Sequence, residues 1–215
     1  MYVFRLFLIL ISVTLVAATS PSASKLQQEP IPSTKRSIEI NQLRMVDALR
    51  KVATTFHVVI GLAETQRADR SRLLNLSLEQ VSLPEALNQI VKADPNYGWE
   101  VGSDGAVRVQ SFEAAPAVGE VVLARFSIHT LYGREISMRL DEQTEIQTWL
   151  REHGCKRVEY SLGHDWEDDK TQISFHTTGK TLRENLDIIA LNAQTYFWSI
   201  TRLGDFDGCE ISIKL

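Results

Sequence analysis

The sequence has only two cysteines, no excess of positive charge and no serine-nucleophile motif. Its 23 Lys and Arg residues are outnumbered by 27 Asp and Glu, a formal net charge of −4 over 215 residues. Such a chain has no general attraction to phosphate backbones, which makes nucleic acid a poor candidate partner. No Gly-x-Ser-x-Gly motif is present and neither cysteine lies near a catalytic motif, so nothing indicates nucleophilic catalysis.

The sequence also has no apolar run long enough for a membrane-spanning helix. The start, MYVFRLFLILISVTLVAATSPSAS, places Arg5 before an apolar run of 13 residues, Leu6 to Ala18, and small residues follow. This is the pattern of a secretory signal, and the run is shorter than the roughly 20 residues of a membrane-spanning helix. We therefore predict a cleaved signal peptide over 1–24, with an uncleaved signal anchor as the alternative. No cysteine follows the run, which disfavours a lipid-anchored lipoprotein.

What is present is a succession of strand and helix patterns in a chain that is 44% hydrophobic. Its length allows one ordinary domain or two small ones. Residues 25–36 are rich in Pro, Ser, Gln and Lys, which predicts a flexible linker. After it, apolar spacing predicts the order strand, helix, strand, strand, helix, strand, strand. The predicted elements are strands at 36–42, 57–61 and 73–80, helices at 43–56 and 82–94, and a hairpin at 97–111.

Three residues delimit these elements. Gly61 is expected to end the second strand, so that the following segment AETQRADRSR forms a polar loop. Ser82 is expected to cap the second helix, and Pro84 suits its first turn because the amide hydrogen that proline lacks has no partner there.

The apolar pattern recurs about 100 residues later. Ile38, Ile40, Val46, Leu49, Val58 and Ile60 are matched 100 positions later by Met138, Leu140, Ile146, Trp149, Val158 and Tyr160. Leu74, Leu76, Leu83, Leu87, Ile90, Trp99 and Val101 are matched 99 positions later by Ile173, Phe175, Leu182, Leu186, Ile189, Trp198 and Ile200. An unrelated chain would lose this register at the first loop. The alternative is that two αβ segments share only generic helix and strand periods.

The predicted fold class is therefore α+β, with two small βαββαββ modules in tandem. Each module is expected to pack two helices against short mixed sheets. The first module spans 37–111 and is followed by a small-residue linker over 112–120. The second spans 121–215, and residues 121–129 are expected to add an extra strand before the repeated pattern begins, either bridging the two modules or extending the second sheet.

The first module resembles the short N-terminal domain shared by secretins and TonB-dependent receptors, the STN family. The resemblance is clearest over residues 37–110 and depends on LRMVDALRKVATTFHVVI, LNLSLEQVSLPEALNQIV and YGWEVGSDGAVRVQ taken together. A fainter second copy over 135–215 is carried by TTGKTLRENLDIIALNAQTYFWSI. Its charged first half, LDEQTEIQTWLREHG, departs from the family, which leaves open another kind of small αβ module.

The resemblance implies two helices between a two-stranded and a three-stranded sheet, and a role in protein contact in the periplasm. Because no run of barrel strands precedes Leu215, we expect a partner of an outer-membrane channel rather than the channel itself. Export also implies an oxidising compartment. In the family-like fold the strands that begin at Cys155 and Cys209 share a sheet, so these residues are candidates for a disulfide. Two buried thiols that do not touch are the alternative.

Three clusters could carry chemistry or binding. The segment GHDWEDDKTQISFH could hold a metal ion or act in acid–base catalysis through His164, Asp165, Glu167, Asp168, Asp169 and His176. It lacks the glycine and ligand spacing of a calcium loop, so we interpret it as a solvated acidic loop. The cluster of Arg67, Arg70 and Arg72 is likewise interpreted as solvated, although it could receive an acidic partner. The aromatic residues Trp99, Trp149, Phe197 and Trp198 are interpreted as packing residues.

The expected function is that of a non-catalytic periplasmic protein-interaction module, with no catalytic residue, no metal and no cofactor. Its expected partner is a secretin, a TonB-dependent receptor, an inner-membrane component or a sigma regulator, in secretion, transport or signalling. Homo-oligomers are possible, nucleic acid is not expected, and the membrane is contacted only through an uncleaved signal. Two alternatives are a small exported metal-binding hydrolase using the His164 to His176 region, and a structural homo-oligomerising envelope protein.

Overall fold

The computed structural model describes residues 33–65, 72–102, 105–112, 117–131, 133–161, 172–203 and 209–215. The predicted signal peptide and most of the predicted linker lie outside these residues. Among the helices that are described, none combines the length and the apolar character needed to cross a bilayer.

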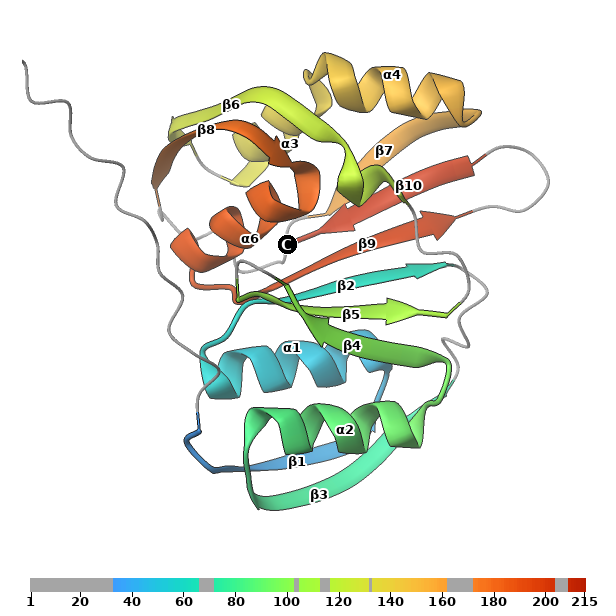
Figure 1. Cartoon of the computed structure of the whole chain (residues 1–215), viewed down its shortest axis with the longest axis vertical. Helices are drawn as coiled ribbons and strands as arrows, with labels where there is room; N and C mark the ends of the chain where they lie inside the picture. The colour runs from blue at the N-terminus through green and yellow to red at the C-terminus, as the bar shows by residue number, and fades with distance from the viewer. Residues whose placement is uncertain are drawn as a thin grey trace, which may run out of the picture.

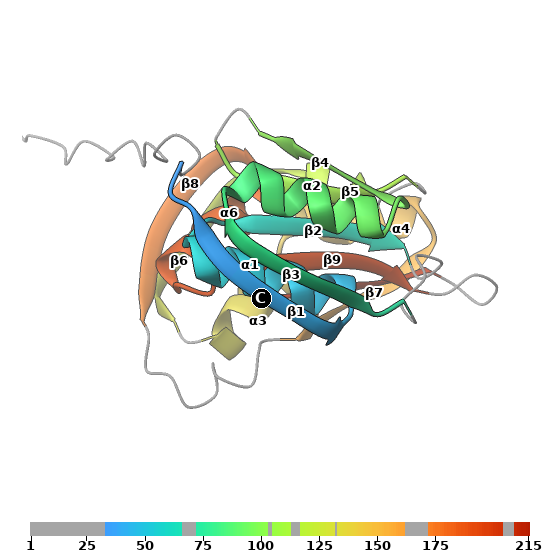
Figure 2. The same ribbon diagram turned by 90° about the horizontal axis from the view of Figure 1, so that it is seen from below.

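The first half of the described chain follows the predicted order of elements. These are β1 (Arg36–Leu43), α1 (Met45–Phe56), β2 (Ile60–Thr65), β3 (Leu74–Val81), α2 (Leu83–Ala93), β4 (Tyr97–Val101) and β5 (Val107–Ser111). Strands β1 and β3 form an antiparallel pair, and the two helices lie between this pair and a larger sheet that contains β2, β5 and β4 (Figures 1 and 2). The alternation of buried Ile38 and Ile40 with exposed neighbours in β1 gives that pair one apolar face for the helices.

The second half contains the remaining elements. They are η1 (Ala117–Glu120), β6 (Val122–Leu131), α3 (Gly133–Asp141), α4 (Thr144–Glu152), β7 (Cys155–Ser161), β8 (Ile173–Thr181), α6 (Leu182–Asn192), β9 (Phe197–Leu203) and β10 (Cys209–Lys214). Strands β6 and β8 form a second antiparallel pair, while β9, β10 and β7 lie side by side. The molecule is therefore a mixed α+β protein, as the sequence predicts.

One sheet runs through both halves. Its strand order is β4-β5-β2-β9-β10-β7, and β2 and β9 pair in parallel at the centre. The sequence predicts short mixed sheets in each module, whereas three strands of each half join into one mixed sheet of six strands. They join because β2 and β9 each present an edge of backbone donors and acceptors that the other satisfies. We call the β2–β9 pairing the central joint.

The two halves bury their apolar side chains on opposite faces of this sheet. Successive side chains of a strand point to opposite faces, and in β9 Phe197 belongs to the hydrophobic cluster around α1 and α2 while Trp198 belongs to the cluster around α6. Strand β2 agrees, since Ile60 joins the first cluster and the preceding Val59 the second. Figure 1 accordingly shows α1 and α2 on one side of the sheet and α6 on the other.

Helices α2 and α6 begin in the same way. Ser82 and Thr181 are the N-cap residues, and the backbone N–H of each donates to the carboxylate of the glutamate three residues later, Glu85 or Glu184, at 2.7 Å. This backbone hydrogen bond is the main cause that lowers the pKa of Glu85. The predicted start of α2 at Ser82, with Pro84 in the first turn, is confirmed.

The predicted match between the two modules is wrong for their opening strands. Met138 and Leu140, matched to the strand residues Ile38 and Ile40, lie in helix α3. The strand that pairs with β8 as β1 pairs with β3 is β6, which the sequence predicts as an extra strand before the repeat. The periodicity of 133–141 is helical, because Ile136 and Leu140 are fully buried while Met138 between them is exposed, whereas in a strand all three residues would share one face.

Gly61 does not end a strand. Strand β2 continues through it to Thr65, because Gly61 is paired with Trp198 across the central joint and its missing side chain leaves room for the indole. A Cβ at this position would overlap the six-membered ring of Trp198. Glycine inside a strand often marks such a close approach, so Gly61 is a requirement of the central joint.

We expect Gly61→Ala to lower the free energy of unfolding by about 1–3 kcal/mol, since the methyl group overpacks the joint. Urea unfolding of Gly61→Ala, Trp198→Phe and the double variant measures the coupling between the two positions. The smaller ring should make the alanine substitution less costly in the double variant. Strictly additive losses would contradict a steric contact between the two residues.

Candidate functional site

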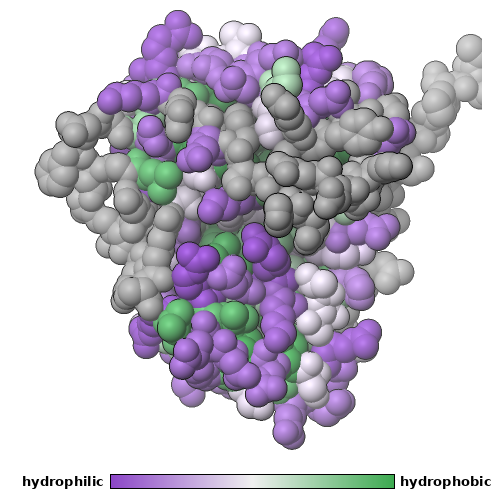
Figure 3. All heavy atoms as spheres, turned by 180° about the vertical axis from the view of Figure 1, so that it is seen from behind, coloured by the Kyte–Doolittle hydropathy of each residue, from purple (hydrophilic) through white to green (hydrophobic). Residues whose placement is uncertain are grey.

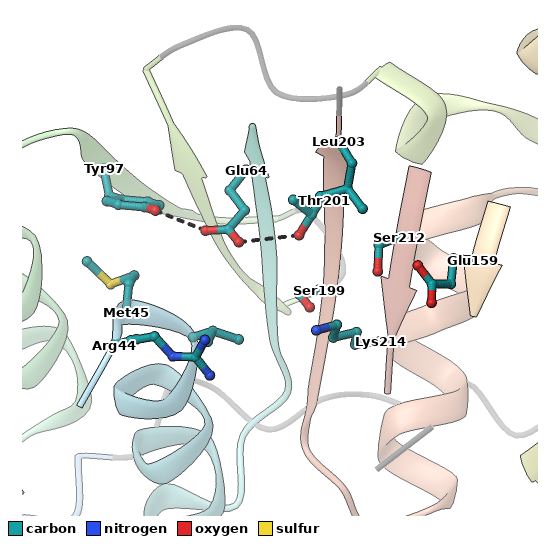
Figure 4. Close-up of a pocket in the computed structure, with 11 residues that line it drawn as sticks. Arg44, Met45, Glu64, Tyr97, Glu159, Ser199, Thr201, Leu203, Ser212 and Lys214 are labelled. Atoms are coloured by element: carbon teal, nitrogen blue, oxygen red, sulfur yellow. Dashed lines mark hydrogen bonds between the residues drawn. The ribbon is translucent and has the colours of Figure 1, made fainter. Parts of the chain in front are cut away.

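A cavity of about 210 Å³ lies beside the central joint, on the sheet face that α1 covers in the first half. Its lining residues are Arg44, Met45, Val46, Glu64, Tyr97, Glu159, Ser199, Thr201, Leu203, Ser212 and Lys214. They come from both halves of the chain, with the start of α1 on one side and strands β9, β10 and β7 forming the floor (Figure 4). The cavity exists because the helices of the second half cover the other face of these strands.

Glu64 is the most buried charged residue of the cavity, with 6% of its surface exposed. Its carboxylate accepts hydrogen bonds from the Tyr97 hydroxyl at 2.9 Å and the Thr201 hydroxyl at 3.3 Å (Figure 4). Burying a carboxylate is costly unless such partners satisfy it. The Glu64–Thr201 hydrogen bond crosses the central joint, so the polar floor of the cavity depends on the pairing of the two halves.

Two serine hydroxyls on the cavity floor have no hydrogen-bond partner among the described residues. Ser199 of β9 is 1% exposed and Ser212 of β10 is 5% exposed, and both side chains point into the cavity (Figure 4). Buried hydroxyls are normally hydrogen-bonded. These two groups therefore have donor and acceptor capacity directed at the cavity interior.

Charged side chains of both signs surround this floor. Lys214 and Glu159 line the cavity from neighbouring strands and form no ion pair within the described part of the chain. Arg44 lines it from the start of α1, where its Nε donates to Asp47 at 3.1 Å. The cavity thus has two cationic and two anionic side chains, with the buried hydroxyls between them.

A second polar contact holds the two halves together on the opposite face of the sheet. Asp187 of α6 accepts a hydrogen bond from the indole N–H of Trp198 at 2.6 Å and pairs with the Arg108 guanidinium of β5 at 3.1 Å. The side chains of Arg108 and Asp187 are 13% and 11% exposed. This contact orients Trp198 over Gly61 and ties α6 to the first half.

We expect Asp187→Asn to lower the free energy of unfolding by about 1–3 kcal/mol, because the amide oxygen can still accept from Trp198 but no charge opposes Arg108. Asp187→Ala should cost more, since Trp198 then loses its acceptor as well. Chemical unfolding of both variants measures this. Equal losses would show that the charge contributes nothing.

The structure joins Cys155 and Cys209 by a disulfide of 2.09 Å. The two residues begin the neighbouring parallel strands β7 and β10 and are register partners, which is the arrangement that the family resemblance implies. Strand β7 is the last of the sheet and has β10 as its only described strand neighbour. The disulfide therefore anchors an edge strand.

Removing the disulfide with Cys155→Ser and Cys209→Ser should lower the free energy of unfolding by about 4 kcal/mol, since the sequence separation is 54 residues and a loop of that size loses entropy in the unfolded chain. Unfolding of the double variant and of the oxidised wild type gives the difference. Thiol titration of the unreduced wild type should find no free thiol, and two free thiols would contradict the bond.

The other sequence-predicted sites are only partly described. His164, Asp165, Glu167, Asp168 and Asp169 lie outside the described residues. His176 lies on β8, where its two ring nitrogens are 2.6 Å from the Ser127 hydroxyl and 3.3 Å from the Thr178 hydroxyl. Within the part of the chain that the structure describes, no group of metal-ligating side chains gathers.

Only one residue of the predicted arginine cluster, Arg72, is described. Arg67 and Arg70 fall outside the described residues, whereas the Arg72 guanidinium lies 3.8 Å from the buried carboxylate of Asp94. The aromatic residues pack as predicted: Phe197 and Trp198 are buried, while Trp99 and Trp149 are partly buried against the two clusters. Arg50 lies over the Phe197 ring, 5.1 Å from its centroid.

The cavity is not predicted by the sequence. Glu64 falls in the segment that is expected to be a loop, because Gly61 is expected to end the strand. The alternation Ser199-Ile-Thr201 and Ser212-Ile-Lys214 was a usable signal, since it gives each strand one apolar and one polar face. No local pattern, however, shows that α1 from the first half lies beside that polar face.

The outer strands of the six-stranded sheet are β4 and β7, and no described strand pairs with their outer edges. The space-filling view of the face behind Figure 1 shows mostly hydrophilic residues, with apolar residues in small separate groups (Figure 3). Among the described residues visible on this face, no extended apolar patch of the kind that marks many protein interfaces is seen (Figure 3).

Comparison with known proteins adds no relative, since no family model, no curated protein and no solved structure matches this chain.

Proposed function

We propose that this protein is an exported, non-catalytic protein-interaction module of the periplasm that binds a partner through an open edge of its central sheet. The observation that carries the proposal is the central joint, in which an edge of the first half and an edge of the second pair through their backbones. The same sheet leaves β4 and β7 as outer strands. An open edge can accept a partner strand by backbone hydrogen bonding.

We further propose that the chain is a tandem of two βαββαββ modules related by duplication. Matching details 99 positions apart support this. Ser82 with Glu85 caps α2 as Thr181 with Glu184 caps α6. The positive φ of Gln80, 50°, recurs at Gly179, 65°. The strand order β4-β5-β2 in the first half corresponds to β9-β10-β7 in the second. In each half, the first and third strands along the chain form the two-stranded pair, which is β1 with β3 and β6 with β8.

The two tryptophans provide the most specific of these correspondences. Trp99 donates its indole N–H to Asn88 at 2.9 Å, and Trp198 donates to Asp187 at 2.6 Å. Both members of the first pair precede those of the second by 99 positions. Two unrelated segments that share only helix and strand periodicity would not form the same hydrogen bond between a helix and the tryptophan of the next strand.

The resemblance of the first half to the STN family supports a place beside an outer-membrane secretin or TonB-dependent system, as an adaptor or regulator. The apolar start of the sequence supports export. This assignment rests on likeness of pattern rather than on a chemical site. The partner in that setting would be the channel or receptor, an inner-membrane component or a sigma regulator.

The outer β4 edge is better suited to a different protein than to a second copy. In the central joint, β9 contributes Phe197 to the first cluster and α6 contributes Asp187 to Arg108. The residues 99 positions earlier are Gly98 and Asn88, which supply neither the aromatic ring nor the charge. A second copy would therefore not reproduce the contacts that stabilise the joint, which favours a heterologous partner over a homo-oligomer.

Two residues of β4 have backbone groups directed at the open edge. The Phe112 N–H donates to Asn96 and the Gly102 N–H donates to Ala106. Residue pairs that exchange hydrogen bonds alternate along an antiparallel ladder, so Gly98 and Glu100 face β5. The intervening residues, Trp99 and Val101, therefore direct their N–H and C=O groups outward.

We expect Val101→Pro to abolish partner binding while leaving the fold intact, because proline removes one outward N–H and no ladder bond to β5. Val101→Thr is the matched control, since it keeps the N–H and a β-branched side chain. The measurement is quantitative capture of envelope proteins by each immobilised variant, with circular dichroism and thermal unfolding to check the fold.

A protein captured by wild type and Val101→Thr, but lost with Val101→Pro, would support strand addition at β4. Equal capture by all three variants would contradict it. Light scattering of the purified chain tests the homo-oligomer, and a dimer broken by Val101→Pro alone would favour self-association at this edge.

A further inference from the structure

We propose that the cavity beside the central joint binds a small zwitterion of the free α-amino acid class. The proposal does not depend on the partner strand at β4. It rests on three features of the described residues: the size of the cavity, its buried hydroxyls without partners, and the two signs of charge that line it.

The size of the cavity limits its occupant. Its volume of about 210 Å³ is below the roughly 300–1,000 Å³ of sites for drug-sized ligands. A folded element or a long peptide does not fit such a space. The occupant is a small molecule with few heavy atoms.

The floor of the cavity is built for a polar ligand. Ser199 and Ser212 are each at least nine-tenths buried, point into the cavity and have no hydrogen-bond partner among the described residues. Hydroxyl groups that face a cavity can donate to and accept from a ligand held in it. An apolar ligand would leave both hydroxyls unsatisfied.

The charged groups select a ligand that carries both signs. Lys214 provides a cationic group for a carboxylate and Glu159 provides a carboxylate for an ammonium group, and neither forms an ion pair with another described residue. Figure 4 shows Lys214 beside Ser199 and Glu159 beside Ser212. A ligand with one charge would pair with only one of these two side chains, whereas an α-amino acid carries a partner for each.

Apolar contact is available as well. Met45, Val46 and Leu203 line the same cavity, so a short aliphatic or hydroxyl-bearing side chain has a surface to pack against. Because the lining comes from both halves of the chain, the bound amino acid would also stabilise the central joint. Anything that binds only the folded protein raises its thermal midpoint.

The experiment uses the full chain and free amino acids as probes. Thermal unfolding with a panel of proteinogenic amino acids identifies those that raise the midpoint, and calorimetric titration gives their dissociation constants. For alanine, the matched one-charge probes are propionate, which lacks the ammonium group, and ethylamine, which lacks the carboxylate. The proposal expects saturable binding of at least one amino acid and dissociation constants at least about tenfold higher for probes with one charge.

Two exposed residues allow the site to be altered without disturbing the core. Lys214→Met and Glu159→Gln each remove one charge from the cavity and should raise the dissociation constant of the bound amino acid about tenfold or more. Lys156→Met and Glu152→Gln are the matched controls, because these exposed residues belong to β7 and α4 and do not line the cavity. The controls should bind like wild type.

Val101→Pro should also bind the amino acid like wild type, which separates this proposal from strand addition at β4. Three results would overturn the proposal. They are the absence of any midpoint shift across the whole panel, equal binding of propionate or ethylamine and the amino acid, and unchanged affinity in both Lys214→Met and Glu159→Gln.

Discussion

The parallel pairing of β2 with β9 is the contact on which the rest of the structure depends. It requires a residue without a side chain at position 61, because the Trp198 indole occupies the space that a Cβ would take. Asp187 holds that indole through its N–H and pairs with Arg108 from the other half. A steric fit on one strand pair and a charge contact beside it thus turn two three-stranded segments into one sheet.

The central joint also decides where polar groups can gather. The helices of the two halves cover opposite faces of the sheet. One face of β9, β10 and β7 is therefore not covered by a described helix of the second half, and α1 of the first half lies beside that face. Ser199, Thr201 and Ser212 lie on that face, together with Glu64 from the first half. In a single module the equivalent strand face would be open to solvent. The cavity is therefore a product of joining the halves and belongs to neither of them alone.

Much of the local structure followed from the sequence, for reasons that can be named. The capping of α2 at Ser82 depends on residues three positions apart, and the burial of Ile38 and Ile40 depends on strand alternation. Both signals are local. The prediction failed at Met138 and Leu140, where two apolar residues two apart looked like a strand but belong to helix α3. The spacing of Ile136 and Leu140 fits a helix and a strand equally well, so the exposure of Met138 between them, which only the structure shows, distinguishes the two.

The sequence by itself determined the α+β class, the order of most elements, and which cysteines were available to pair, since these depend on periodicity, capping and count. Only the tertiary structure decided that Gly61 continues a strand, that Glu64 is buried, and that one sheet joins both halves. The physical reason is that each of these outcomes depends on a partner more than 100 residues away: Trp198 for Gly61, Thr201 for Glu64 and β9 for β2. Local sequence patterns do not indicate which distant strand will pair with a given strand edge.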